Sequence, residues 1–511
     1  MKKYFCLAVL ILLASTVCAA ITLPSIISDN MVLQADSTAP IWGKAEPNSK
    51  ITIACSWNKA AVTVESDEQG KWIAKLKTPE KGENCTITIT CGKDSITISN
   101  ILIGQVWLCS GQSNMEFLTK QSINADKELA EAKFPNIRLF NVTRTTSKEP
   151  LDDCNGQWVE CSPETAAEFS AVGYFFGKEL YKKLKTPIGL INTSFGGSPA
   201  QAWTNKEILS KDNRLNTYLE NDANNEAHKE IYLKQYAETL NQWKKDVARA
   251  VAEGKPAARK PSPPVQLKAH CKCAALYNAM IHPLIPFAIK GVIWYQGESN
   301  VDDAVAYRKL FPAMITNWRD EWKQGDFPFY FVQIAAYGQT DLTTPPDSKW
   351  AMLREAQTMT LSLTSTGMAV AMDIGEAKNI HPKNKQDVGK RLALWALAKD
   401  YGFKDIVYSG PLYKSMKIEG NKVRASFEYA DSGLMAKGDS IKGFAIAGAD
   451  RKFVWANAKI DGNTVLVWSE QIKNPAAVRY GWANWIDCNL YNKEFLPASP
   501  FRTDDFPGKT E

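Results

Sequence analysis

The sequence predicts a protein of the α/β class, in which a central domain with a parallel β-sheet is flanked by β-rich units at both ends. Apolar segments such as GVIWYQ and FPFYFVQI alternate with helix-like segments in the middle of the chain, which is typical of a parallel sheet covered by helices on both faces. Shorter segments rich in Ile, Thr, Val and Trp, separated by turn residues, occupy both ends. The length of 511 residues favours about two to four domains.

Residues 1–20 predict a secretory signal peptide. Lys2 and Lys3 form its positive start, FCLAVLILLA its apolar middle, and small residues near Ala20 its cleavage site. The apolar part is shorter than the ~20 residues needed to span a bilayer. We therefore expect an exported protein, periplasmic or secreted. Lipid attachment at Cys18 is the alternative, although Val17 suits that processing poorly.

The remaining chain divides into three predicted parts. Residues 21–100 alternate β-like segments with Gly, Pro, Asn and Asp, and predict an N-terminal β-sandwich. Residues 101–407 predict the α/β domain, whose last helix, in KNKQDVGKRLALWALAKDYG, stops at Gly402. Within this domain, residues of about 205–265 are charged and end in a Pro-rich stretch, which indicates a helical insertion. Residues 408–511 return to β-like segments and predict a C-terminal β-rich domain.

The composition limits the kinds of partner that we expect for this protein. The chain is 45% hydrophobic and 23% charged, as expected for a globular protein with a large core. A net charge of +6, from 61 basic and 55 acidic residues without a dense basic run, argues against nucleic acid as a partner. No second long apolar stretch follows the signal peptide, so we expect no membrane insertion after cleavage.

The cysteine content is compatible with an oxidising compartment, but it does not determine which cysteines form disulfides. Eleven cysteines minus Cys6 and Cys18 leave nine in the mature chain, an odd number that cannot pair completely. Cys154 and Cys161 are near enough in sequence to close a small disulfide loop. The segment HCKC at 270–273 lacks the second ligand pair of a zinc site, so no metal is predicted.

Polar clusters follow four of the apolar segments in the α/β domain. They hold Ser113 in CSGQSNMEF, Gly196 and Gly197 in FGGS, Gln296 in YQGESN, and His381 in NIHP. In an open parallel sheet, ligands bind just beyond the carboxyl ends of the strands. We therefore expect these clusters to meet at one edge of the sheet.

Together the clusters supply what ester hydrolysis requires. Ser113 can be the nucleophile, and His381 the base, because an imidazole with a pKa near ~6.5 suits proton transfer at neutral pH. The backbone N–H of Gly197 and the carboxamide of Gln296 can donate to the oxyanion, a contribution worth about 3 kcal/mol for each donor. His282 shares the IHP triplet but precedes an apolar segment, and His228 and His270 lie in charged or cysteine-rich surroundings, so we expect these three to be non-catalytic.

Four long motifs resemble the sialate O-acetylesterases, a branch of the SGNH hydrolase superfamily. They are GQVWLCSGQSNMEF, GLINTSFGGSPAQAWT, LYNAMIHPLIPFAIKGVIWYQGESN and IHPKNKQDVGKRLALWAL, and the similarity extends over nearly the whole mature chain. The resemblance implies a flavodoxin-like SGNH fold, Ser113 as nucleophile and His381 as base. It also implies O-acetylated sialic acid as the substrate class, with acetylated plant polysaccharides for close relatives, and no cofactor.

One position departs from the family pattern. An aspartate usually stands two or three residues before the histidine, where this chain has Asn379 and Lys378. In a serine protease the change from Asp to Asn costs ~10⁴ in turnover. Three outcomes are open: a dyad helped by Asn379 or a backbone carbonyl, which we favour; a carboxylate from elsewhere; or a weak enzyme. The carboxylates that can serve are Asp373, Glu376 and Glu298.

The predicted function is therefore that of an exported serine carbohydrate esterase, a sialate O-acetylesterase that works through an acetyl-enzyme on an O-acetylated sugar. Trp203 is expected beside the sugar, and Glu298 is expected in the substrate site or as an anchor in its turn. The closest alternative is an acetyl xylan esterase or another polysaccharide deacetylase. More distant ones are a carbohydrate-binding protein with a decayed esterase centre, and a glycoside hydrolase using Glu298, which requires a second, facing carboxylate.

Overall fold

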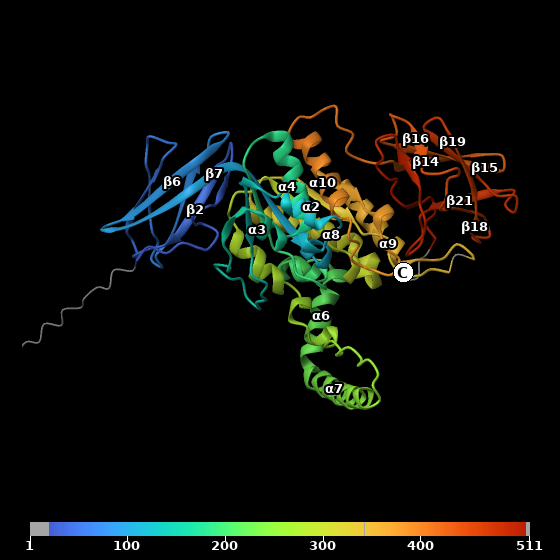
Figure 1. The fold of residues 1–511 in the computed structure, drawn as a ribbon, viewed down its shortest axis with the longest axis horizontal. Coiled ribbons are helices and arrows are strands. Elements are labelled where there is room, and N and C mark those ends of the chain that lie inside the picture. Colours follow the sequence, from blue (N-terminus) through green and yellow to red (C-terminus); the bar gives the residue numbers. More distant parts are fainter. Residues whose placement is uncertain (1–19, 342, 507–511) are drawn as a thin grey trace, which may run out of the picture.

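The computed structural model describes residues 20–341 and 343–506. The predicted signal peptide therefore lies outside the described residues, apart from Ala20. Figure 1 shows three parts in a row: an N-terminal β unit, a central α/β domain and a C-terminal β unit, with a helical arm leaving the central domain. No helix in the described part of the chain is both long and apolar enough for a membrane span.

The N-terminal unit is built from strands whose side chains alternate between core and solvent. In β5, KWIAKLK, every second residue is buried, the pattern of a strand with one face on a core. Strand β2 pairs with β5, while β3 pairs with β4 and β6, and β6 pairs with β7. The strands are β1 (Val32–Gln34), β2 (Thr38–Lys44), β3 (Lys50–Cys55), β4 (Val62–Glu65), β5 (Lys71–Lys77), β6 (Gly82–Cys91) and β7 (Asp94–Gly111).

Strand β7 joins the N-terminal unit to the central domain. Its first half pairs with β6 and β1, as at Leu102 beside Val32, and its second half pairs with β10 and β11 from Gln105 to Gly111. The predicted boundary at residue 100 thus falls inside one continuous strand.

The central sheet has the order β13-β12-β11-β7-β10-β8-β9. Every neighbouring pair is parallel except β8 and β9. All residues of β11 and β12 are buried, because helices cover both faces. The chain order reverses at β7, with β10 on one side and β11 on the other, and such a reversal opens a crevice at the carboxyl ends of the strands. The strands are β8 (Phe134–Asn141), β9 (Trp158–Cys161), β10 (Ile188–Asn192), β11 (Gly291–Tyr295), β12 (Phe329–Gln333) and β13 (Thr366–Val370).

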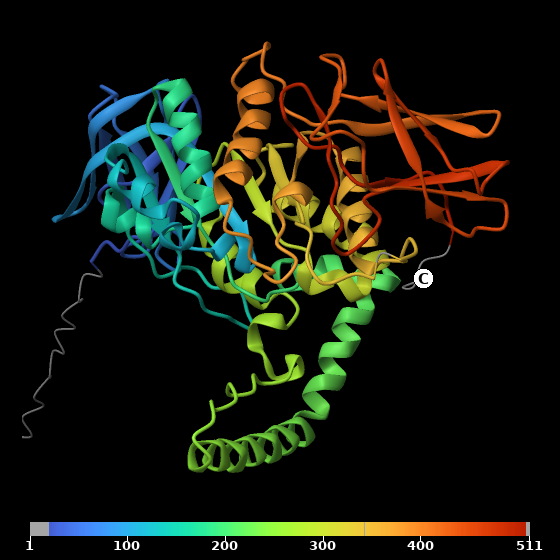
Figure 2. The ribbon, with the colours of Figure 1, turned by 45° about the vertical axis from the view of Figure 1, so that its right-hand side comes forward.

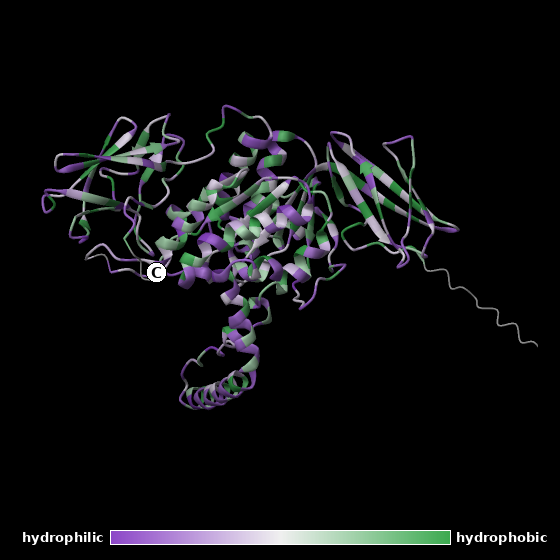
Figure 3. Ribbon diagram, turned by 180° about the vertical axis from the view of Figure 1, so that it is seen from behind, coloured by the Kyte–Doolittle hydropathy of each residue, from purple (hydrophilic) through white to green (hydrophobic). Residues whose placement is uncertain are grey.

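Two pairs of helices enclose this sheet. On one face α4 and α10 pack together and bury Phe175, Phe176 and Trp395 against the strands. On the other face α8 and α9 pack together and bury Phe311 and Trp318. Figure 3 shows that apolar residues gather in the strands and inner helix faces of this domain. The helices are α1 (Ser113–Glu116), α2 (Ala125–Ala130), α3 (Pro163–Ala167), α4 (Ala171–Leu184), α8 (Ala304–Trp322), α9 (Lys349–Met359) and α10 (Lys385–Asp400).

The expected insertion forms α5 (Lys206–Ser210), α6 (Asn213–Ala227) and α7 (Lys229–Ala252). Figure 2 shows α7 at the tip of an arm that points away from the body. No residue of α7 is buried, and the helix contacts α6 and the returning loop, where the Trp243 indole donates to the Ala258 carbonyl. Seen from behind, hydrophilic residues predominate on the arm (Figure 3).

The C-terminal unit contains two four-stranded sheets, β14-β15-β20-β19 and β18-β17-β21-β23, and the pair β16-β22. The strands are β14 (Leu412–Glu419), β15 (Lys422–Glu428), β16 (Leu434–Ala436), β17 (Phe444–Gly448), β18 (Val454–Trp455), β19 (Asn457–Asp461), β20 (Thr464–Trp468), β21 (Pro475–Tyr480), β22 (Leu490–Asn492) and β23 (Phe501–Arg502).

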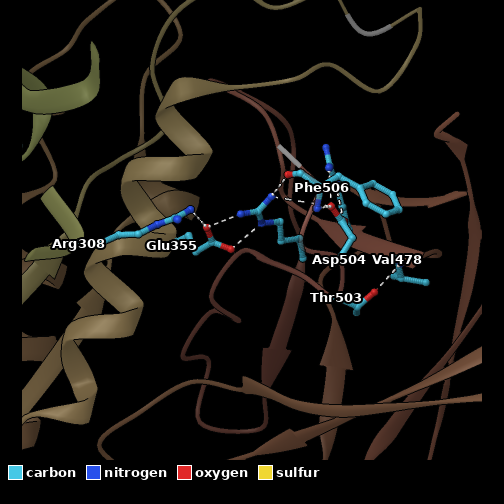
Figure 4. Close-up of polar contacts among 8 residues, drawn as sticks. Arg308, Glu355, Val478, Thr503, Asp504 and Phe506 are labelled. Atoms are coloured by element: carbon cyan, nitrogen blue, oxygen red, sulfur yellow. Dashed lines mark hydrogen bonds and ion pairs between the residues drawn. The ribbon is translucent and has the colours of Figure 1, made fainter. Parts of the chain in front are cut away.

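Ion pairs attach this unit to the central domain. The Glu355 carboxylate on α9 accepts from Arg308 on α8 and from Arg502 on β23 (Figure 4). Within the C-terminal unit, Arg479 donates from Nε and Nη2 to the two carboxylate oxygens of Asp504. These contacts are largely buried, so solvent screens them less than surface pairs.

The nine cysteines within the described residues are all unpaired. Cys154 and Cys161 are both buried and form no bond, so the small disulfide loop anticipated from their spacing is not formed. Burial raises the pKa of each thiol to about 12, which keeps both protonated and unreactive.

Candidate active site

Ser113 stands where β7 leaves the sheet. The chain turns at Gly111, whose φ is +140° and where a Cβ atom would lie 2.2 Å from the Tyr295 carbonyl oxygen on β11. Only glycine allows this approach. Gln112 then donates its backbone N–H to the same carbonyl, and α1 begins at Ser113. The serine is half-buried, with its hydroxyl at the carboxyl edge of the sheet.

His381 meets this serine from the loop between β13 and α10. Its Nε2 atom lies 2.8 Å from Ser113 Oγ, across 268 positions of sequence. Burial lowers the pKa of the imidazole below its ordinary value, and the charge of Lys385 lowers it further. A neutral imidazole in hydrogen-bond contact with a serine hydroxyl can accept the hydroxyl proton.

Asn379 contacts the backbone of His381. Its Oδ1 accepts from the His381 N–H at 3.0 Å, and its Nδ2 donates to the His381 carbonyl at 2.9 Å and to Glu376 at 3.2 Å. Glu376 also accepts the backbone N–H of Lys383. The loop is therefore held on both sides of the histidine.

Among the described residues, no carboxylate is hydrogen-bonded to the His381 ring. Asp373 pairs with Arg391, Glu376 contacts Asn379, and Glu298 contacts Asn114. The expected contact between Asn379 and the imidazole ring is not formed, because the Asn379 carboxamide bonds to the peptide of His381. The serine and histidine therefore form a pair whose loop, and not whose ring, is held by Asn379.

The backbone N–H groups of Ser113 and Gly197 have no acceptor in the described part of the chain. Gly197 follows Gly196, at which an added Cβ atom would lie 3.4 Å from Ser113 Cβ. Gly197 follows β10 in an exposed turn with φ of +71°, and an added Cβ atom there would meet His270 Nε2 at 3.8 Å. The N–H of neighbouring Gly196 is already bonded to the Glu116 carboxylate. Free N–H groups beside a serine nucleophile are suited to an oxyanion.

Gln296 lies elsewhere than expected. Its carboxamide is completely buried, donates to Asn300 Oδ1 at 2.7 Å and to the Ser198 carbonyl at 3.3 Å, and accepts from the Tyr307 hydroxyl. Both of its amide hydrogens are therefore engaged within the protein. The oxyanion role predicted for Gln296 does not fit this geometry. The residue instead stabilises the turn after β11 through its hydrogen bonds to Asn300 and Ser198.

Two further expectations for substrate contacts are corrected. Trp203 has no exposed surface: its indole donates to Ser198 Oγ and packs edge-on against Trp294, so it belongs to the core and cannot lie beside a sugar. The Glu298 carboxylate accepts from Asn114 Nδ2 at 2.6 Å, and its other oxygen is shielded from solvent. Glu298 thus anchors Asn114, as the alternative expectation for this residue had it.

Several residues around the serine were not anticipated. Glu116 pairs with Arg144 in addition to Gly196, and the His270 ring stacks on Phe195 with centroids 4.5 Å apart. Glu116 stands in the same motif as Ser113, so its position was a usable signal. Arg144 and His270 come from distant loops without any sequence pattern that marks them.

A serine hydroxyl bonded to an imidazole, beside free N–H groups at the crevice of a parallel sheet, is the arrangement of a hydrolase that attacks carbonyl carbon. The family model "Carbohydrate esterase, sialic acid-specific acetylesterase" matches residues 103–251 and 266–398, more than half of the chain. The protein is accordingly a carbohydrate esterase.

Proteins of the same class are similar to this chain over nearly its whole length. The chain is 30% identical to the sialate O-acetylesterases of Mus musculus and Homo sapiens, over 93% and 95% of its length and 93% of theirs. The crystal structure of a carbohydrate acetylesterase from Xanthomonas citri superposes with a TM-score of 0.80 at 36% identity, covering 95% of this chain and 100% of that one. The chain belongs to the family of sialic acid-specific acetylesterases.

Proposed function

We propose that this protein hydrolyses O-acetyl esters of sialic acid through an acetyl-enzyme, with Ser113 as nucleophile and His381 as base. The observation that carries the proposal is the 2.8 Å hydrogen bond between Ser113 Oγ and His381 Nε2 in a chain of this esterase family. Sialic acid as the sugar is supported by the names of the curated relatives.

In the first half-reaction, Ser113 Oγ attacks the acetyl carbonyl carbon while its proton passes to His381 Nε2. The backbone N–H groups of Ser113 and Gly197 stabilise the oxyanion that forms. The intermediate then expels the sugar oxygen, which takes the proton from His381. The products are the free sugar hydroxyl and acetylated Ser113.

In the second half-reaction, a water molecule gives its proton to His381 Nε2 and attacks the acetyl group. The second tetrahedral intermediate collapses, and Ser113 recovers its proton as acetate leaves. Asn379 holds the peptide of His381 through both steps. No cofactor enters this scheme.

The proposal includes two assignments beyond the chemistry. The central domain is assigned to the SGNH hydrolases, supported by the placement of Ser113, Gly197 and His381 after β7, β10 and β13. Export, to the periplasm or the medium, is supported by the signal-like residues 1–20.

Acetate release from O-acetylated sialic acid tests the function. We expect hydrolysis by the wild type, and a loss of at least about 10³-fold in Ser113→Ala and His381→Ala. His282→Ala is the matched control for the second variant, because its imidazole contacts the Leu151 carbonyl instead of a serine. A fluorophosphonate should label wild-type Ser113. Retained activity in Ser113→Ala rejects the mechanism, and absence of both hydrolysis and labelling favours a carbohydrate-binding protein.

A second candidate is the deacetylation of polysaccharides such as xylan. It is favoured by the Xanthomonas citri structure, which is described as a carbohydrate acetylesterase and has the higher identity of 36%. Parallel assays of acetate release from acetylated xylan and O-acetylated sialic acid, at equal acetyl concentration, separate the two. A kcat/KM at least tenfold higher on xylan would select the second candidate.

A further inference from the structure

A lysine side chain is buried directly beneath the serine turn. Lys385 is the first residue of α10 and has no exposed surface. Its ammonium donates to Asn114 Oδ1 at 2.6 Å and lies over the rings of Phe117 and Tyr295, 4.9 and 5.2 Å from their centroids. Burying a lysine is costly unless the charge has partners, and the hydrolytic steps above do not use it.

The partner of this lysine, Asn114, forms three hydrogen bonds through its carboxamide. Its Oδ1 accepts from Lys385, while its Nδ2 donates to Glu298 Oε1 at 2.6 Å and to the Ile380 carbonyl at 3.0 Å. An ammonium can only donate, and a carboxylate or carbonyl oxygen can only accept. Lys385 and Glu298 therefore fix which end of the amide faces Ile380.

The hydrogen bond between Asn114 and Ile380 matters because each residue is next to a member of the catalytic pair. Asn114 directly follows Ser113, and Ile380 directly precedes His381. The Asn114–Ile380 hydrogen bond therefore closes a small ring with the bond between Ser113 Oγ and His381 Nε2. A shift of the histidine loop relative to the serine turn has to break it.

We propose, on the basis of the catalytic pair proposed above, that Asn114 is a positioning residue which sets the distance between Ser113 and His381, and that Lys385 and Glu298 hold it in place. The carboxylate that fixes the imidazole in a complete triad is absent among the described residues. Here the position of the imidazole is fixed through the backbone on both sides of it. Asn379 bonds to the peptide groups of His381, and Asn114 bonds to the carbonyl of Ile380.

The charges around Lys385 are consistent with this role. Burial lowers the pKa of Lys385 to about 7, against the opposing effect of the carboxylates of Glu298 and Glu376. Burial also raises the pKa of Glu298. Tyr295 and His381 are also titratable groups near the ammonium. Burial lowers the pKa of His381, and the charge of Lys385 lowers it further. Lys385 thus holds Asn114 and also disfavours the imidazolium.

The central experiment measures kcat and KM of Asn114→Ala on p-nitrophenyl acetate, with Ser113→Ala beside it. We expect kcat to fall about 10²-fold, because an error near 1 Å between reacting groups has that effect, with KM changed less than about threefold. Glu298→Gln keeps the oxygen that accepts from Asn114 and should stay within about threefold of wild-type kcat. Glu298→Leu, which loses that oxygen, should fall at least about tenfold.

The double variant Lys385→Met with Glu298→Gln guards against a failure to fold. It removes both buried charges at nearly constant volume, a change that proteins tolerate, and we expect a thermal midpoint within about 4 °C of wild type. Its kcat should fall at least about tenfold, and the acid limb of its kcat/KM profile should move to higher pH because the cation near His381 is gone. Lys390 is an exposed lysine on the same helix. The control variant Lys390→Met should change neither kcat nor the acid limb of the profile.

The outcomes separate the two levels of the proposal. If Ser113→Ala is inactive while Asn114→Ala and the double variant keep kcat within about threefold of wild type, the positioning role is wrong and the proposed function stands. If the acid limb stays in place in the double variant, the electrostatic part of the role is wrong. Activity in Ser113→Ala would instead overturn the catalytic pair itself.

Discussion

Asn379 and His381 are joined by two hydrogen bonds that run between a side chain and a peptide backbone. The carboxamide oxygen of Asn379 accepts the His381 N–H at 3.0 Å, and its NH₂ group donates to the His381 carbonyl at 2.9 Å. The asparagine therefore fixes the loop that carries the base, while the ring is positioned by its contact with Ser113. This explains how the site is ordered without the usual aspartate.

We first predict that Asn379→Asp does not restore a triad. An aspartate keeps the acceptor for the His381 N–H but loses both donated bonds and places a second carboxylate beside Glu376. With two lost hydrogen bonds worth about 1 kcal/mol each, kcat should fall up to about 30-fold. Steady-state kinetics on p-nitrophenyl acetate measures this, and Lys378→Ala, an exposed neighbour, is the control. A rise in kcat would mean that the new carboxylate reaches the ring.

The second prediction concerns pH. The base must be neutral to accept the serine proton, and burial together with Lys385 lowers the pKa of His381. Protonation therefore sets in only below the ordinary value, so kcat/KM should rise with pH through an inflection below ~6.5 and be level at neutral pH. A pH–rate profile from pH 4 to 8 measures it. An inflection clearly above ~6.5 contradicts the lowered pKa.

The third prediction is that Glu116 supports the glycine turn of the oxyanion site. Its carboxylate binds the Gly196 N–H and Arg144, and Glu116→Ala frees the turn that carries Gly197. We expect kcat to fall at least about tenfold with little change in the free energy of unfolding. Arg144→Ala is the comparison, since an exposed ion pair contributes about 0–1 kcal/mol, and its kcat should change less than about threefold. An equal loss of kcat in Glu116→Ala and Arg144→Ala would show that the effect comes from the arginine.

The fourth prediction separates structure from catalysis at Gln296. Gln296→Leu removes the buried acceptor of the Tyr307 hydroxyl and the amide that donates to Asn300 Oδ1 and to the Ser198 carbonyl, so the free energy of unfolding should fall by about 2–4 kcal/mol. The kcat of the folded variant should drop by less than about tenfold. Denaturant unfolding and kinetics below the transition measure the two quantities. A loss of about 10²–10³ in kcat with unchanged stability would restore Gln296 as an oxyanion donor.

Much of this architecture was predictable because it depends on local pattern. Uninterrupted apolar runs become strands buried on both faces, and polar residues directly after them lie at one edge. This pattern predicted that Ser113 and His381 would lie close together, and their side chains are 2.8 Å apart. The direction of a single side chain after a strand is not encoded in that pattern. For this reason Gln296 and Trp203 were assigned to the site, although both point into the core.

Charged residues were harder to place. Lys385 lies in KNKQDVGK, where a lysine normally faces solvent, and only the approach of α10 to the serine turn buries it. Arg144 and His270 reach the site from loops with no periodicity. Their positions follow from tertiary packing, which single-sequence patterns do not contain.

The continuity of β7 has a consequence for how this protein can be divided. The same backbone that hydrogen-bonds the N-terminal sheet at residues 94–103 ends at the turn before Ser113. A truncation at residue 101 would not detach an accessory module but would leave the strand that presents the nucleophile with one end unsupported. Chimeras and shortened versions of this enzyme should therefore keep both parts together.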